Sequence, residues 1–194
     1  MTGPRTRVRS WPQAQMPAAV REQVSALQED AWPGNDPGRP GVAHDPALSP
    51  LSMVLVDDGG TVLAALDILT KHLAHDGGRY LASGLSTVVT SPAHRRRGHG
   101  RRLVTAAREA IQASGADLGI FTCDRPLRGF YASAGWQCLG GTVLIGGTPQ
   151  QPFPSDQLDK VTMAAFFSRR ACAHARSFRH SRIALYPGTI DRLW

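Results

Sequence analysis

The chain has 194 residues, of which 42% are hydrophobic and 19% charged, and this balance predicts one folded domain over residues 1–194 rather than a disordered chain. No stretch approaches the roughly 18 apolar residues of a membrane-spanning helix, and no apolar segment follows the basic first residues as in a secretory signal, so we expect a cytoplasmic protein with no membrane partner. The net charge of +7 permits a nucleic-acid partner, but apart from a cluster at 95–102 the arginines are scattered, so charge alone does not establish one.

The expected elements alternate between strand and helix patterns bounded by Gly, Pro and Asp. In chain order they are a strand over 6–11, a helix over 16–31, a loop over 33–50, strands over 51–56, 61–75 and 79–90, a helix over 100–114, a strand over 118–123, a helix over 126–134, and strands over 136–145 and 161–167. This order predicts an α+β fold with one central sheet, antiparallel at first and partly parallel later.

Three cysteines, Cys123, Cys138 and Cys172, lack the C-x-x-C spacing of metal sites and are odd in number. We therefore predict no metal and no disulfide framework, and interpret them as buried reduced thiols. The apolar run 163–167 is typical of a core strand, although it could also serve a homodimer contact.

The most informative segment is Ser91-Pro92-Ala93-His94-Arg95-Arg96-Arg97-Gly98-His99-Gly100-Arg101-Arg102. An apolar strand pattern precedes it and an amphipathic helix follows. Two glycines at such a junction let main-chain N–H groups converge at a helix N-terminus, which favours a phosphate. The segment is no Walker A loop, because no Gly-Lys-Ser/Thr occurs, and it lacks the third glycine of a dinucleotide fingerprint.

This loop and a second motif resemble the GNAT superfamily of acetyl-CoA-dependent N-acetyltransferases. The run Val88-Val89-Thr90 leading into Arg95-x-x-Gly98-x-Gly100 is similar to the family's motif A, and Tyr131-Ala132-Ser133-Ala134-Gly135-Trp136 is similar to its motif B. The resemblance implies a GNAT fold: a mixed, mostly antiparallel sheet with helices on both faces and central strands splayed at the acetyl-CoA site.

The resemblance also implies roles for individual residues. The main chain of Val88, Val89 and Thr90 would pair with the pantetheine arm, and Arg95 would brace the loop. Main-chain amides that would bind the pyrophosphate belong to Arg96, Arg97, Gly98, His99, Gly100 and Arg101. Tyr131 would protonate the leaving thiolate, since a tyrosine of ordinary pKa stays protonated at neutral pH. A main-chain N–H near Val88 would polarise the thioester carbonyl.

Within the superfamily the chain resembles aminoglycoside 2'-N-acetyltransferases, through Leu103-Val104, motif B and the ending Asp191-Arg192-Leu193-Trp194. The resemblance implies Asp36, Ser86 and Trp194 as substrate-binding residues. Where those enzymes carry a glutamate, this chain has Ser86, so proton removal needs another group. Asp67 is the expected catalytic base, because a charge inside an apolar strand is unusual. The alternatives are His72, Asp124, Asp30, Asp36 and the carboxylate of Trp194.

The acceptor remains open among three hypotheses. A small primary amine, such as an aminoglycoside, is expected first, and a basic protein with only 15 acids favours a less cationic antibiotic such as kasugamycin. The second hypothesis is a protein N-terminus or lysine, and the third is a non-enzymatic nucleic-acid-binding module using the arginine cluster.

Overall fold

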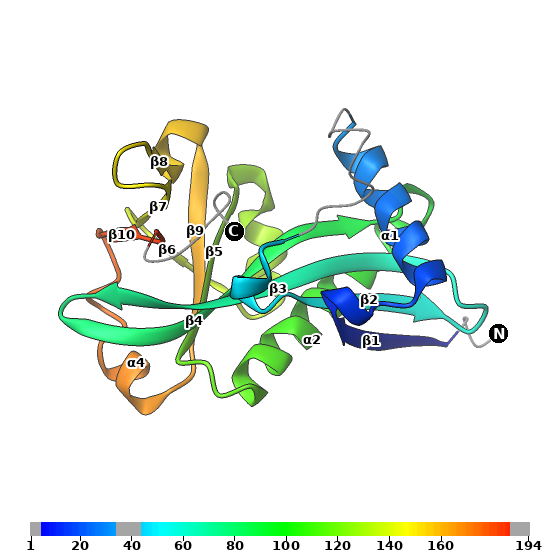
Figure 1. Cartoon of the computed structure of the whole chain (residues 1–194), viewed down its shortest axis with the longest axis horizontal. Coiled ribbons are helices and arrows are strands. Elements are labelled where there is room, and N and C mark those ends of the chain that lie inside the picture. Colours follow the sequence, from blue (N-terminus) through cyan, green and yellow to red (C-terminus); the bar gives the residue numbers. More distant parts are fainter. Residues whose placement is uncertain (1–4, 34–43, 187–194) are drawn as a thin grey trace.

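A computed structural model of the chain describes residues 5–33 and 44–186, so Asp36 and Trp194 lie outside the described residues. A seven-stranded sheet forms its centre, with the strand order β1-β2-β3-β4-β5-β9-β6 (Figure 1). The strands are β1 (Thr6–Pro12), β2 (Leu51–Asp57), β3 (Val62–His75), β4 (Gly78–Thr90), β5 (Leu118–Asp124), β9 (Lys160–Phe166) and β6 (Gln137–Leu139). Among the described strands of this sheet, only the β4–β5 pair is parallel, which confirms the expected mixed, mostly antiparallel sheet.

Helices cover both faces of this sheet, as expected (Figure 1). They are α1 (Ala18–Ala31), α2 (His99–Ala113), α3 (Arg128–Ser133) and α4 (Arg169–Ala173). The short 3-10 helices are η1 (Gln13–Gln15), η2 (Pro46–Leu48), η3 (Pro92–His94), η4 (Arg125–Leu127) and η5 (Ser155–Leu158). Proline 17 precedes α1, which begins two residues later than predicted.

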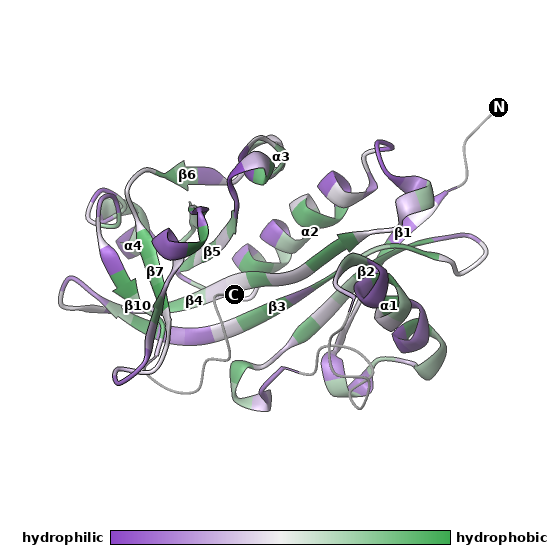
Figure 2. Ribbon diagram, turned by 90° about the horizontal axis from the view of Figure 1, so that it is seen from above, coloured by the Kyte–Doolittle hydropathy of each residue, from purple (hydrophilic) through white to green (hydrophobic). Residues whose placement is uncertain are grey.

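Two apolar clusters hold the helices against the sheet. Val24 of α1 packs with Val54, Ala65 and Val89, whose side chains point to one face. The buried residues of α2 recur at helical spacing and join the larger cluster on the opposite face: Leu103, Val104, Ala107 and Ile111. Figure 2 shows the hydrophobic segments along β3, β4 and α2 that make up this interior. Burial of these side chains is the main force positioning the loop before α2.

A second sheet of three strands, which the sequence did not predict, has the order β10-β7-β8. Its strands are β7 (Val143–Gly147), β8 (Pro152–Pro154) and β10 (Arg182–Ala184). The single strand expected over 136–145 is wrong: β6 and β7 belong to different sheets. Gly141, with φ of +69°, lies in the turn between them, and a Cβ there would meet the ring of His180.

The cysteine interpretation is confirmed for one residue and wrong for another. Cys123 is buried in β5, Cys138 is half-buried, and Cys172 is exposed on α4. The run 163–167 begins as the expected core strand, since Met163, Ala164 and Ala165 are buried in β9. Within residues 5–33 and 44–186, no helix is long and apolar enough to cross a membrane.

Candidate active site

The parallel strands β4 and β5 separate soon after they meet. Only two residue pairs join them, Ala82 with Leu118 and Ser83 with Gly119, although β4 continues to Thr90 and β5 to Asp124. Figure 1 shows β5 turning away from β4 beyond this point. Gly119 is required there, because a Cβ would lie 2.6 Å from Cζ3 of Trp136. Among the described residues, no strand pairs with the second half of the β4 edge that faces β5, so this edge is available to an extended ligand.

β4 leads through η3 to the start of α2. Gly98 lies at the N-cap with φ of +79°, and a Cβ built there would extend into open space. Gly100 is closely packed, because a Cβ built there would lie 2.7 Å from Oγ1 of Thr90. Arg95 donates from Nε to the Thr90 carbonyl at 3.4 Å, which ties the loop back to β4. Arg96 also has a left-handed main chain, with φ of +61°.

The N-terminus of α2 is suited to an anion. No side chain among the described residues caps it, and its first turn contains no acid. Free N–H groups at the start of a 15-residue helix carry partial positive charge and bind phosphate groups readily. Partial burial, then the charges of His94, Arg97 and Arg102, lower the pKa of His99, as expected where positive potential is concentrated. The residues thus fit the diphosphate of a coenzyme.

Tyr131 lies on α3, directly after the open end of β5. Its ring is 5% exposed and packs edge to face against Phe121 at 5.0 Å between centroids, while Phe121 packs in the same way against Trp136 at 4.8 Å. Burial raises the pKa of the Tyr131 hydroxyl well above its ordinary value, with smaller contributions from Cys123 and Asp124. The hydroxyl is therefore protonated at neutral pH and available as a donor.

Asp67 is 3% exposed and lies on β3, on the face that α1 covers. Three donors from three segments converge on its carboxylate. Nε2 of His44 lies 3.2 Å from Oδ2, Oγ1 of Thr87 donates to the same oxygen at 2.8 Å, and Oγ of Ser52 donates to Oδ1. A buried carboxylate needs such partners to offset the loss of water. Its burial and its three partners leave Asp67 poorly placed to meet an amine directly.

Of the other expected residues that the structure describes, Ser86 lies beside Asp67. Ser86 pairs with it across β3 and β4, so the two share one face of the sheet. His72 and Asp30 are exposed, and Asp124 forms an exposed ion pair with Lys160 at 2.6 Å. No cluster of three or more His, Cys, Asp or Glu side chains that could hold a metal occurs in the described residues.

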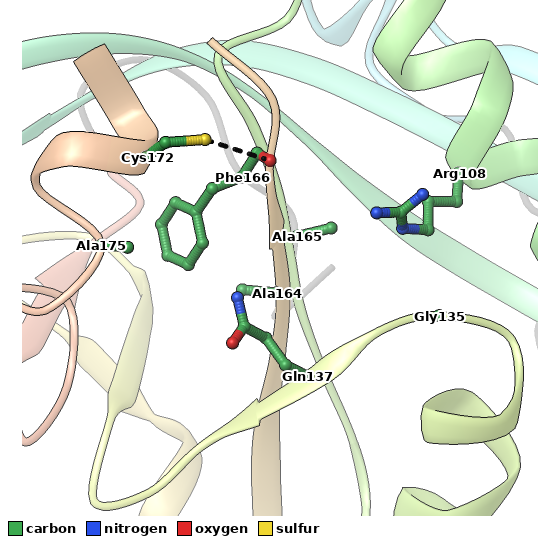
Figure 3. Close-up of a pocket in the computed structure, with 8 residues that line it drawn as sticks. All are labelled: Arg108, Gly135, Gln137, Ala164, Ala165, Phe166, Cys172 and Ala175. Atoms are coloured by element: carbon green, nitrogen blue, oxygen red, sulfur yellow. Dashed lines mark hydrogen bonds between the residues drawn. The ribbon is translucent and has the colours of Figure 1, made fainter. Parts of the chain in front are cut away.

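Two surface pockets flank α2 without coinciding with the β4–β5 gap. The pocket in Figure 3, about 270 Å³, lies between Arg108 of α2, Gln137 of β6 and Cys172 of α4. The other, about 430 Å³, lies between α2 and Val8 of β1 and reaches the loop at Gly98. The first shares no residue with the loop between β4 and α2 and is not assigned to the reaction.

Sequence reasoning missed three residues beside Asp67: His44, Ser52 and Thr87. Ser52 and Thr87 are ordinary residues for strands, and no local spacing connects them with His44. The missed Gly119 carried a weak signal, since a glycine inside an apolar strand marks a close approach.

Comparison with known proteins agrees with this geometry. A family model described as an acetyltransferase (GNAT) domain matches residues 15–139. Among similar solved structures is the GNAT family N-acetyltransferase YhbS from Escherichia coli in complex with CoA, with a TM-score of 0.59, 13% identity, and coverage of 95% of this chain and 91% of that chain. ElaA from Escherichia coli has a TM-score of 0.56 and 15% identity over 82% of this chain and 99% of that one. No curated protein sequence matches the chain significantly.

A third similar structure is the ribosomal-protein-S18-alanine N-acetyltransferase from Escherichia coli, with a TM-score of 0.55 and 15% identity over 84% of this chain and 95% of that chain. At these identities the solved structures establish the fold, and the family model establishes the class. The chain belongs to the GNAT family, and it is an acetyl-CoA-dependent acyltransferase.

Proposed function

We propose that this protein transfers acetyl from acetyl-CoA to a primary amine of a small molecule, with amino-sugar antibiotics as the first candidates. The observation that carries the proposal is the open edge of β4, which leads directly to an uncapped helix N-terminus. The extended thioester arm of acetyl-CoA would lie along the β4 edge, and its diphosphate would lie at the helix N-terminus. The resulting modification of an antibiotic would confer resistance to it, and the cytoplasmic location of this reaction remains a prediction from the sequence.

The coenzyme would be held by main-chain groups. Residues 88–90 of β4 would pair with the pantetheine arm as an added strand, because β5 has left that edge. Main-chain N–H groups of 96–101 would bind the diphosphate, and the exposed arginines around them would offset its charge. Arg95 acts on the loop itself through its bond to the Thr90 carbonyl.

The chemical step needs a neutral amine, a polarised carbonyl and a proton for sulfur. As the C–N bond forms and the C–S bond breaks, negative charge develops on the sulfur. Tyr131 would donate a hydrogen bond and then its proton to that sulfur, and the proton released from the nitrogen restores the balance. Because burial raises the pKa of Tyr131, the donor stays protonated across the working pH range.

The charge of the chain favours acceptors with few ammonium groups. A polycationic sugar is bound best by a collection of carboxylates, and this chain has 15 acids against 22 Lys and Arg. The buried Asp67 is already hydrogen-bonded to three neighbours. Kasugamycin, an amino sugar with its own acidic group, is therefore a better candidate than kanamycin-type sugars. Asp36 and Trp194, which the sequence resemblance assigns to substrate binding, remain predictions.

A panel assay tests the proposal. Free CoA release from acetyl-CoA is measured with kasugamycin, kanamycin-type sugars and a set of peptides with free N-termini. We expect turnover with an amino sugar, at a higher kcat/KM for kasugamycin. Turnover of peptides alone would replace this proposal with protein acetylation, and tight nucleic-acid binding without turnover would favour a non-enzymatic role.

A further inference from the structure

β4 contains a bulge at the position where the coenzyme arm is proposed to lie. Ala65 of β3 pairs with Val89, and Asp67 pairs with Ser86, so Thr87 and Val88 together lie opposite a single residue of β3. Such an extra residue bends the strand and redirects its main-chain groups. The bulge lies beyond the last β4–β5 pair, Ser83 with Gly119, and therefore beside the open edge.

Thr87 adopts an unfavourable main-chain conformation in this bulge. Its φ is +51°, in the left-handed region that β-branched residues rarely occupy. A conformation of this kind is strained and persists only where neighbouring groups hold it. The Thr87 hydroxyl donates a hydrogen bond to the Asp67 carboxylate at 2.8 Å, which ties this residue to β3.

The carboxylate is itself fixed from two other sides. Oγ of Ser52 in β2 donates to Oδ1. Nε2 of His44, just before η2, lies 3.2 Å from Oδ2, and the side chains of His44 and Asp67 are each 5% exposed. The main-chain N–H of His44 donates in turn to Oε1 of Gln13. Asp67 thus connects β2, β3 and the segment before η2 to one hydroxyl of the bulge.

We propose that Asp67 is a positioning residue for acetyl transfer, and that it acts by holding Thr87 in the left-handed conformation that forms the β4 bulge. The bulge aims a main-chain N–H of 87–88 at the thioester carbonyl, where negative charge develops. This inference rests on the proposed function for the presence of a thioester at the open edge. It replaces the role of direct base that the sequence predicted for Asp67.

A readout that needs no acceptor amine isolates this role. Acetyl-CoA carrying ¹³C at the carbonyl is bound to the protein, and its carbonyl stretch is measured by isotope-edited infrared spectroscopy. A hydrogen bond to the carbonyl lowers the stretching frequency, and it makes acetyl-CoA bind more tightly than CoA by about 2- to 10-fold, the usual net effect of one hydrogen bond. Wild-type protein is expected to show both effects.

The decisive variants are Asp67→Ala, Thr87→Gly and their combination. Glycine adopts positive φ without steric cost, so it keeps the bulge without help from Asp67. Asp67→Ala alone removes the acceptor of the Thr87 hydroxyl and is expected to abolish the infrared shift and the preference for acetyl-CoA, and the double variant is expected to recover them. A base role for Asp67 predicts no loss in Asp67→Ala, because this readout contains no amine to deprotonate.

A matched control and an isosteric variant complete the series. Thr87→Val removes the hydroxyl with little change of shape and is expected to reproduce the loss seen in Asp67→Ala. Thr70→Val removes another threonine hydroxyl from the same strand pair, one that bonds Ser83 at 2.8 Å outside the bulge, and is expected to change nothing.

The outcomes separate the two proposals. A retained shift in Asp67→Ala, or a double variant no better than Asp67→Ala, overturns the positioning role while leaving acetyl-CoA binding intact. If Asp67→Ala does not fold, Thr87→Val decides, since a retained shift there also overturns the role. Wild-type protein that binds neither CoA nor acetyl-CoA would overturn the proposed function and this role with it.

Discussion

Gly100→Ala is the sharpest perturbation of the loop that is proposed to bind the coenzyme diphosphate. The added Cβ would lie 2.7 Å from Oγ1 of Thr90 and 3.3 Å from Cζ of Phe130, and real Cβ atoms do not approach within 3.0 Å. Overpacking of this kind costs about 1–3 kcal/mol, while alanine regains roughly 0.5–1 kcal/mol over glycine within a helix. We expect a net loss of about 1–2 kcal/mol, or a melting temperature lower by roughly 2–8 °C for a chain of this size.

The assay is thermal unfolding together with acetyl-CoA titration by calorimetry. Thr90→Ala removes the clashing oxygen and keeps the main chain, so the double variant with Gly100→Ala is expected to recover most of the lost stability. Two other glycines are controls. Gly129→Ala, in α3 with open space, is expected to be neutral or slightly stabilising, whereas Gly98→Ala is expected to destabilise through its φ of +79° and to gain nothing from Thr90→Ala.

The reasoning is refuted if Gly100→Ala unfolds at the wild-type temperature and binds acetyl-CoA as tightly as wild type. It is also refuted if Thr90→Ala restores none of the loss, because the close contact with Oγ1 would then not be its cause.

Three further predictions concern titratable groups. Tyr131→Phe is expected to lower kcat on the order of 100-fold while the acetyl-CoA dissociation constant stays unchanged, as judged by steady-state kinetics and calorimetry; unchanged kcat would remove Tyr131 from the mechanism. The pKa of His99 is lowered in the free protein and a diphosphate would raise it, so acetyl-CoA affinity should strengthen from pH 7.5 to 6 more in wild type than in His99→Gln; equal slopes would contradict this. Burial lowers the pKa of Lys71 from its ordinary 10.5, so between the lowered pKa and 10.5 the unfolded chain binds more protons than the folded chain. The free energy of unfolding therefore rises with pH in that range. Urea unfolding at pH 7 and 9.5 should show this rise in wild type and a smaller one in Lys71→Met.

Much of the candidate coenzyme site follows from local signals. The two glycines before α2, the apolar stripe of that helix, and a tyrosine four residues before Gly135 all lie within short stretches of chain. Helix periodicity, turn residues and strand patterns operate over such distances, which is why α1, α2, α3 and the strands β1 to β5 were predictable within a few residues. The second sheet was not, because β7 pairs with β10 nearly 40 residues later and both are short.

The Asp67 network shows the other limit. The sequence indicates an unusual charge in an apolar strand, but its partners come from positions 44, 52 and 87. Their meeting depends on the register of β2 with β3, on the bulge in β4, and on the path of the chain before η2. Residue type alone made Asp67 a candidate base, whereas its burial and its three donors point to a positioning role.

The sequence by itself therefore determined the family, and it predicted the candidate phosphate-binding loop and the candidate tyrosine donor, since each depends on residues close together in the chain. Only the tertiary structure decided how far β4 and β5 separate, where the second sheet lies, and which groups surround Asp67. The physical reason is that strand register and side-chain packing bring together residues far apart in the chain, and neither is encoded in local spacing.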